Sequence, residues 1–253
     1  MSRNRFHSHR GEGPRTVRHA LLHATVGVLA GLAVSGCLSP NPGQAQPRIE
    51  WNQVAWPGGT VNVALVRPVD EGTQDHPVII ALPWGSGSAD LVRSFVQSYW
   101  LPEPAVRGYY VVAPEVRGPS LETTADELIP ALFDWMSTEL TFDPSRVVLV
   151  GASNGGRGLF FAAVAQPARF DALLAMPGLY AGDASDLSVL SGKPIRLLVG
   201  QLDDTWVQGT RRTARALDSV GITAEVQVLA GQPHVLSVDP RELLDWIDEA
   251  LGR

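Results

Sequence analysis

A serine in a glycine-flanked turn is the residue of this sequence best suited to act as a nucleophile. Ser153 stands at the centre of the segment GASNG, residues 151–155, which fits the pattern G-x-S-x-G. In this pattern the serine occupies a tight strand-to-helix turn, and its neighbours two residues away must be small. The aliphatic run 147–150 precedes the turn and resembles a strand buried on both faces of a parallel sheet. The sequence therefore predicts that the Ser153 hydroxyl projects above a sheet.

A serine hydroxyl becomes an effective nucleophile when a base takes its proton, and that base is usually a histidine held by a carboxylate. Four of the six histidines lie within the first 23 residues, in a segment that we expect to be removed. His76 precedes a predicted strand, at the end of a parallel sheet where ligand sites do not form. His234 lies on the loop after the last predicted strand, at the same sheet edge as Ser153, and is therefore the predicted base.

The carboxylate that orients the histidine is predicted on the loop after the strand 195–199. Asp203 and Asp204 both lie on this loop. We favour Asp203 because it falls three residues after Gly200, and we expect the other aspartate to be solvated or to cap the following helix. The chain order serine, aspartate, histidine is that of α/β-hydrolases and differs from the two serine-protease orders.

An acyl-transfer site also needs backbone N–H groups that stabilise the developing oxyanion. We expect the N–H of Asn154 to supply one of them, together with the N–H of Ser86 or Gly85, between which the sequence does not choose. Trp84 is expected either in the core or as an apolar wall for the substrate, and Trp206 is a second candidate for such a wall.

Predicted strands alternate with predicted helices from residue 48 onward. The strands are 48–56, 60–67, 77–82, 109–113, 146–150, 172–176, 195–199 and 224–229, and the helices are 89–100, 124–140, a helix from the serine turn to 165, 210–220 and 240–251. This order predicts one α/β domain with a mostly parallel sheet of about eight strands and helices on both faces. The short segment 178–193 leaves little room for a lid, and an open site of this kind favours bulky or polymeric esters.

Residues 48–253 resemble the α/β-hydrolases, and within them the secreted serine esterases of the polyhydroxybutyrate depolymerase, feruloyl esterase and dienelactone-hydrolase-like groups. The matching parts are 143–146, 151–156, 166–170, 200–203 and His234. The resemblance implies hydrolysis of carboxylic esters through an acyl-enzyme, without a metal or an organic cofactor. Two departures are visible. Trp84 replaces the histidine of a histidine-glycine motif, and the serine replaces the cysteine that dienelactone hydrolases use, so their lactone chemistry is not implied.

The N-terminus resembles the signal peptide of a bacterial lipoprotein. Five arginines within the first 18 residues precede the apolar run 20–34, which is short for a transmembrane helix. The sequence VSGC then ends at Cys37, as in a lipobox, where cleavage leaves a lipid-modified cysteine as the new N-terminus. We therefore expect a signal peptide at 1–36, a lipidated cysteine and tether at 37–47 and the hydrolase domain at 48–253, anchored in the cell envelope. The alternative is an ordinary secretory signal.

Composition excludes several other classes of function. Removal of residues 1–36 leaves 15 basic and 25 acidic residues, a formal charge of −10, which disfavours nucleic acid as a partner. Beyond Cys37 the sequence has no cysteine, which excludes a disulfide, a thiolate nucleophile and a cysteine metal site in the domain. Besides an esterase, two alternatives stay open: a peptidase of the prolyl-oligopeptidase-like type, which usually carries a further specificity domain, and a non-catalytic surface-binding lipoprotein.

Overall fold

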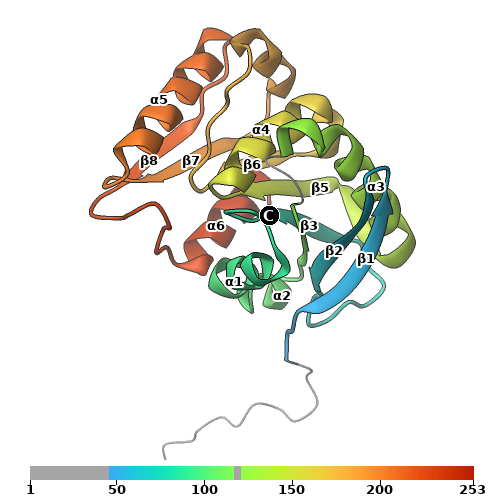
Figure 1. Ribbon diagram of the computed structural model, residues 1–253. Helices are drawn as coiled ribbons and strands as arrows, with labels where there is room; N and C mark the ends of the chain where they lie inside the picture. The colour runs from blue at the N-terminus through green and yellow to red at the C-terminus, as the bar shows by residue number, and fades with distance from the viewer. Residues whose placement is uncertain (1–45, 117–120) are drawn as a thin grey trace, which may run out of the picture. The chain divides into compact units, whose positions relative to one another are not determined.

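An eight-stranded sheet with strand order β1-β2-β4-β3-β5-β6-β7-β8 forms the centre of the fold (Figure 1). Its strands are β1 Glu50–Trp56, β2 Gly59–Val66, β3 His76–Leu82, β4 Tyr110–Pro114, β5 Phe142–Gly151, β6 Ala172–Ala175, β7 Ile195–Gly200 and β8 Glu225–Leu229. β2 runs antiparallel to β1 and β4, and the remaining neighbours are parallel. This computed structural model describes residues 46–116 and 121–253, so the predicted signal peptide and Cys37 lie outside the described residues.

Continuous aliphatic runs place β3, β4 and β5 at the centre of the sheet. Every residue of β3 and β4 is buried. Apart from His76, at the start of β3, these strands consist of aliphatic residues, proline and one tyrosine, as expected for strands that are covered on both faces. The register pairs Leu82 with Gly151, which brings the carboxyl ends of β3 and β5 side by side. The turn after β5 therefore begins directly beside the loop that follows β3.

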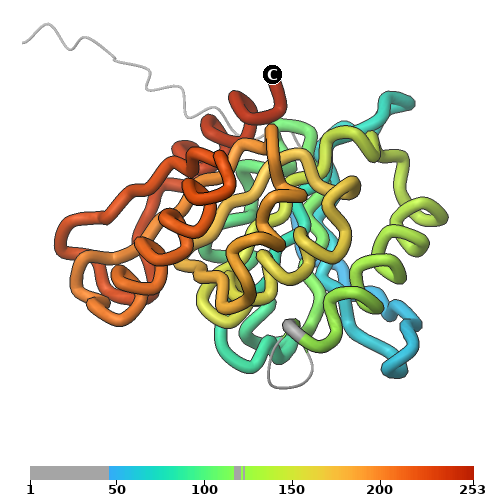
Figure 2. The backbone as a smooth tube through the Cα atoms, turned by 90° about the horizontal axis from the view of Figure 1, so that it is seen from above, coloured from blue at the N-terminus to red at the C-terminus, as the bar shows by residue number. Residues whose placement is uncertain are grey.

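Helices cover both faces of the sheet. They are α1 Ala89–Tyr99, α2 Glu103–Val106, α3 Ala125–Glu139, α4 Asn154–Ala165, α5 Asp204–Ser219 and α6 Pro240–Ala250. α1 and α6 contribute to the hydrophobic cluster on one face, and α3, α4 and α5 contribute to the cluster on the other (Figure 1). Viewed from above, the β1–β2 hairpin lies at one end of this unit, and β8 with α5 lies at the other (Figure 2).

The structure confirms the predicted α/β fold with eight strands, most of them parallel, and corrects some boundaries. The helix predicted at 210–220 begins at Asp204, because the Asp203 side chain caps it, accepting from the Trp206 N–H. Gly209 concealed this start, since a glycine inside a helix weakens the sequence pattern. In the structure, a Cβ at Gly209 would lie 2.7 Å from the end of the Leu179 side chain. The short helix α2 was not predicted.

The segment between β6 and β7 is short and packs onto the core. It contains a 3₁₀-helix, Ala184–Leu190, whose Leu187 and Leu190 side chains are fully buried. Its apolar residues are therefore used to close the hydrophobic cluster on the α4 and α5 face. Among the described residues, this segment adds no lid above the sheet.

Candidate active site

The turn between β5 and α4 holds Ser153 in an unusual backbone conformation. Its φ is 55° and its ψ is −112°, and it is the one non-glycine residue with a positive φ in the described ranges 46–116 and 121–253. Such a conformation costs about 1–3 kcal/mol and persists only when its surroundings enforce it. Here the Ser153 N–H donates to the Pro177 carbonyl at 2.8 Å, and the Gly155 N–H donates to the Pro83 carbonyl at 3.1 Å. The predicted turn geometry is therefore present and is held from two neighbouring loops.

The glycines around Ser153 are required because backbone atoms crowd them. A Cβ at Gly155 would lie 2.2 Å from the Leu82 carbonyl oxygen, and a Cβ at Gly156 would lie 2.1 Å from the Pro177 carbonyl oxygen. Contacts that short involve backbone rather than movable side chains, so a larger residue would force α4 away from the sheet. These glycines keep the first turn of α4 pressed against the ends of β3 and β6.

His234 connects the serine to an aspartate. Its Nε2 lies 2.8 Å from Ser153 Oγ, and its Nδ1 lies 2.5 Å from Asp203 Oδ2. An ionised carboxylate can only accept a hydrogen bond, so Nδ1 carries the proton and Nε2 is left to accept from the serine hydroxyl. Asp203, rather than Asp204, therefore faces the histidine; Asp204 is exposed in the first turn of α5. The structure brings together the three residues that the sequence predicted.

The loop that carries His234 is fixed by contacts that the sequence did not indicate. The Gln232 side chain binds the Ser237 backbone twice, with Oε1 accepting from the N–H at 3.0 Å and Nε2 donating to the carbonyl at 3.2 Å. The Tyr99 hydroxyl donates to the Leu236 carbonyl, and burial raises the pKa of Tyr99, which keeps that hydroxyl protonated. These side chains hold the loop on both sides of His234.

A close backbone approach adds to these contacts. A Cβ at Gly200 would lie 2.0 Å from the Pro233 carbonyl oxygen, so the end of β7 touches the residue before His234. The Leu202 N–H donates to the Gln232 carbonyl at 2.9 Å and joins the two loops again. The aspartate and the histidine are thus positioned by one packed pair of loops.

Backbone N–H groups surround the serine where an oxyanion could be bound. Within the described residues, the N–H groups of Asn154, Gly85 and Ser86 have no hydrogen-bond partner. The Asn154 side chain donates to the Gly85 carbonyl at 3.0 Å and ties the loop after β3 to the first turn of α4. The geometry is compatible with either Gly85 or Ser86 as the second donor, so their roles stay predictions.

The two tryptophans that were considered as substrate walls differ in their surroundings. Trp84 is half-buried and packs edge-to-face on Phe95 and Tyr99, with ring centroids 5.0 and 6.0 Å away, and so belongs to the core. The Trp206 ring instead lies 5.1 Å from the His234 ring. The Arg157 guanidinium lies 5.1 Å from the Trp206 ring. Nothing in the sequence pattern singled out Arg157, because its contact is with a side chain on another helix.

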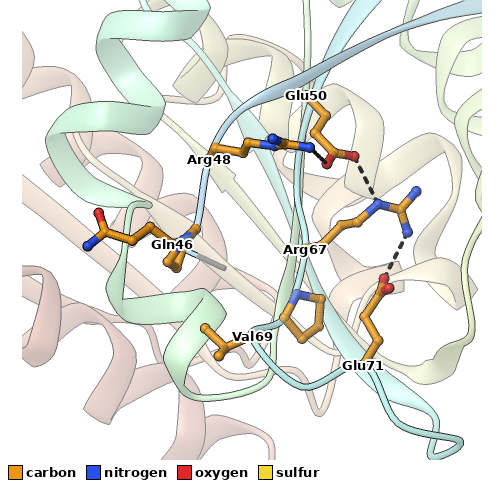
Figure 3. Close-up of a pocket in the computed structure, with 8 residues that line it drawn as sticks. Gln46, Arg48, Glu50, Arg67, Val69 and Glu71 are labelled. Atoms are coloured by element: carbon orange, nitrogen blue, oxygen red, sulfur yellow. Dashed lines mark hydrogen bonds and ion pairs between the residues drawn. The ribbon is translucent and has the colours of Figure 1, made fainter. Parts of the chain in front are cut away.

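A separate groove of about 730 Å³ lies next to the amino end of β4, at the ends of the parallel strands that are opposite to Ser153 (Figure 3). Its charged side chains bind one another: Arg48 pairs with Glu50, and Arg67 pairs with both Glu50 and Glu71. His76 lies at this same edge, and its ring nitrogens are 2.8 and 2.6 Å from two carbonyl oxygens. His76 is therefore far from Ser153, as predicted.

The described residues contain no group of three or more histidine, cysteine, aspartate or glutamate side chains arranged to hold a metal ion. In residues 46–116 and 121–253, no helix is long and apolar enough to span a membrane.

Several solved hydrolase structures are similar to this chain. A thermostable esterase matches 79% of this chain at TM-score 0.67 and 19% identity, and the chain spans 62% of its length. A fungal esterase from Rhizomucor miehei matches 83% of this chain at TM-score 0.66 and 14% identity, over 85% of its own length. Dipeptidyl peptidase 4 of Porphyromonas gingivalis matches 82% at TM-score 0.63 and 15% identity, and the chain spans 36% of that protein. No protein-family model and no curated protein matches the chain. By its sheet order and by this similarity, the chain has the α/β-hydrolase fold.

Proposed function

We propose that this protein is a serine hydrolase that cleaves carboxylic esters through an acyl-enzyme. The observation that supports this most strongly is the unbroken hydrogen-bond series from Ser153 Oγ through His234 to Asp203. A strained turn presents the serine, and an imidazole accepts its proton, which is the arrangement that nucleophilic acyl transfer requires.

The proposed reaction has two steps. In the first, Ser153 Oγ attacks the ester carbonyl while its proton passes to His234 Nε2, and the alcohol leaves with that proton as the acyl-enzyme forms. In the second, His234 takes a proton from water, the resulting hydroxide attacks the acyl group, and the acid leaves as the serine regains its proton. Asp203 keeps the proton on Nδ1 and stabilises the imidazolium. The N–H of Asn154, with that of Gly85 or Ser86, would stabilise the oxyanion.

Esters are proposed over peptides because two of the similar structures described above are esterases. The segment that packs onto the core between β6 and β7 also leaves the serine without a lid from that side, which suits bulky or polymeric esters. The similarity to dipeptidyl peptidase 4 favours a second candidate, a serine peptidase with the same three residues. This chemistry needs no metal and no organic cofactor.

Hydrolysis of p-nitrophenyl acetate and butyrate tests the proposal. We expect turnover by the purified wild-type protein and no turnover by a Ser153→Ala variant whose thermal stability equals that of the wild type. Aminoacyl and dipeptidyl p-nitroanilides serve as the peptidase arm, and their preferential cleavage would replace the ester assignment with the peptidase one. A folded wild-type protein that cleaves neither class would instead support a non-catalytic binding protein.

We also propose that Cys37 carries a lipid that anchors the domain to the bacterial cell envelope. The proposal rests on the arginine-rich start, the apolar run and the VSGC sequence. Wild-type protein should partition into detergent and incorporate labelled palmitate, whereas Cys37→Ser should do neither. Equal partitioning of the two proteins would refute lipid anchoring at this cysteine.

A further inference from the structure

Arg157 is a positive charge placed beside the proposed catalytic residues. It lies one turn after Ser153 on α4, and its N–H donates to the Ser153 carbonyl at 3.0 Å. Its guanidinium lies 5.1 Å from the Trp206 ring, which in turn lies 5.1 Å from the His234 ring. Guanidinium, indole and imidazole therefore line one side of the site.

Arg157 has no carboxylate partner within the described residues. Its side chain is exposed, although the protein is acidic overall and many of its other arginines form ion pairs. Among residues 46–116 and 121–253, Arg211, Arg212 and Arg215 on α5 also have no carboxylate partner, but none of them lies over an aromatic ring. Arg157 differs from them because the Trp206 ring contacts both its guanidinium and the His234 ring.

The contact with the Trp206 ring leaves the guanidinium able to bind an anion. A guanidinium that lies over an aromatic ring uses its face for that contact and keeps its N–H groups at the edge, where they can donate in parallel to a carboxylate. Among the described residues, Asp203 forms no ion pair with Arg157; its carboxylate accepts from His234 and from the Trp206 backbone N–H. Trp206 thus restricts the position of the charge without neutralising it.

We propose that Arg157, positioned by Trp206, forms an anion subsite, so that the preferred esters carry a carboxylate on the acyl part. This inference rests on the proposed esterase function and narrows its substrate class. A charge-assisted hydrogen bond of this kind at a partly exposed site should raise kcat/KM roughly tenfold over a matched neutral ester. Salt should reduce this preference, since exposed charges are screened.

The test compares pairs of p-nitrophenyl esters of equal length. One member of each pair is the half-ester of adipic or suberic acid, with a free carboxylate, and the other has that carboxylate capped as a methyl ester. The readout is the ratio of kcat/KM for the anionic ester to that for the neutral ester, measured at low and at high salt. The ratio cancels differences in enzyme concentration and in the reactivity of the leaving group.

Arg157→Gln is compared with Arg169→Gln as a matched control. Arg169 also lies over an aromatic ring, with its guanidinium 4.6 Å from the Phe133 ring, but it follows the far end of α4. Both variants remove one positive charge, so a general effect of net charge would appear in both. Thermal unfolding of both proteins establishes that they are folded.

We expect the ratio to be roughly ten in the wild type and in Arg169→Gln, and close to one in Arg157→Gln. A wild-type ratio of one or less would overturn the anion subsite while leaving the esterase function intact, because the neutral esters would still be cleaved. An unchanged ratio in Arg157→Gln would also overturn it. Failure of the folded wild type to cleave any of the esters would overturn both proposals together.

Discussion

Asp203→Asn is expected to abolish most of the activity while leaving the fold intact. Asp203 has two partners, since Oδ2 faces His234 Nδ1 at 2.5 Å and Oδ1 accepts from the Trp206 N–H at 3.4 Å. An asparagine can keep the second contact through its carbonyl oxygen, and its NH₂ group then faces Nδ1. Because that group donates, the imidazole proton must move to Nε2, which can no longer accept from the Ser153 hydroxyl.

The expected loss in kcat is about 10⁴-fold, which corresponds to about 5 kcal/mol of transition-state stabilisation. Stability should change by less than about 1 kcal/mol, because asparagine caps a helix as well as aspartate does. For a domain of this size, that limit corresponds to a shift of about 2–4 °C in Tm. The assay is p-nitrophenyl butyrate hydrolysis at saturating substrate, with thermal unfolding followed by circular dichroism.

Asp204→Asn is the matched control. It removes the neighbouring charge from the first turn of α5, where the carboxylate is exposed and does not contact His234. We expect its kcat to stay within about twofold of the wild type. Its free energy of unfolding should fall by about 0.5 kcal/mol, because the first turn of the helix loses a negative charge that interacts favourably with the helix dipole. Retention of more than a tenth of the activity by Asp203→Asn, or an equal loss in Asp204→Asn, would refute the assigned role of Asp203.

Two other predictions follow from the packing. Gly200→Ala should lower kcat/KM at least tenfold, roughly the effect of a small displacement of a catalytic group, because its Cβ would displace the loop that carries His234. Gly192→Ala is the control: Gly192 has a φ of +81° and open space around it, so this variant should lower stability but not activity. Equal activity of the two variants would contradict this reasoning. Burial and the hydrogen bond to Glu71 raise the pKa of Tyr110 to about 12. The folded state then holds this proton more tightly than the unfolded state, whose tyrosine titrates near 10, so stability is lost as pH rises from about 10 to 12. Urea unfolding at pH 9 and 11.5 should show about 2 kcal/mol more loss in wild type than in Tyr110→Phe, and parallel losses would contradict the assignment.

The fold could be predicted from the sequence because its central strands are buried on both faces. The runs 147–150, 77–82 and 111–114 have no polar side chain that would suit an exposed surface. Ser153 was identifiable because its turn requires glycines at fixed positions, and His234 because the other histidines lay in unsuitable places. Those arguments depend on local sequence or on strand order, both of which can be read along the chain.

The remaining features of the site depend on contacts between distant segments. Gln232 and Tyr99 hold the His234 loop through backbone carbonyl and N–H groups, which leave no pattern in the sequence. Arg157 meets Trp206 only because the fold brings the first turns of α4 and α5 together. The start of α5 has a local explanation instead, since Gly209 weakens the helical pattern in the first half of that helix.

Covalent labelling of the nucleophile would show directly whether Ser153 is the reactive serine. The wild-type protein would be treated with a fluorophosphonate probe, and the modified peptide would be identified by mass spectrometry. We expect one adduct, on Ser153, with no adduct in Ser153→Ala and much slower labelling in His234→Ala. A folded wild-type protein that stays unlabelled, or that carries the adduct on another residue, would contradict the assignment of Ser153 as the nucleophile.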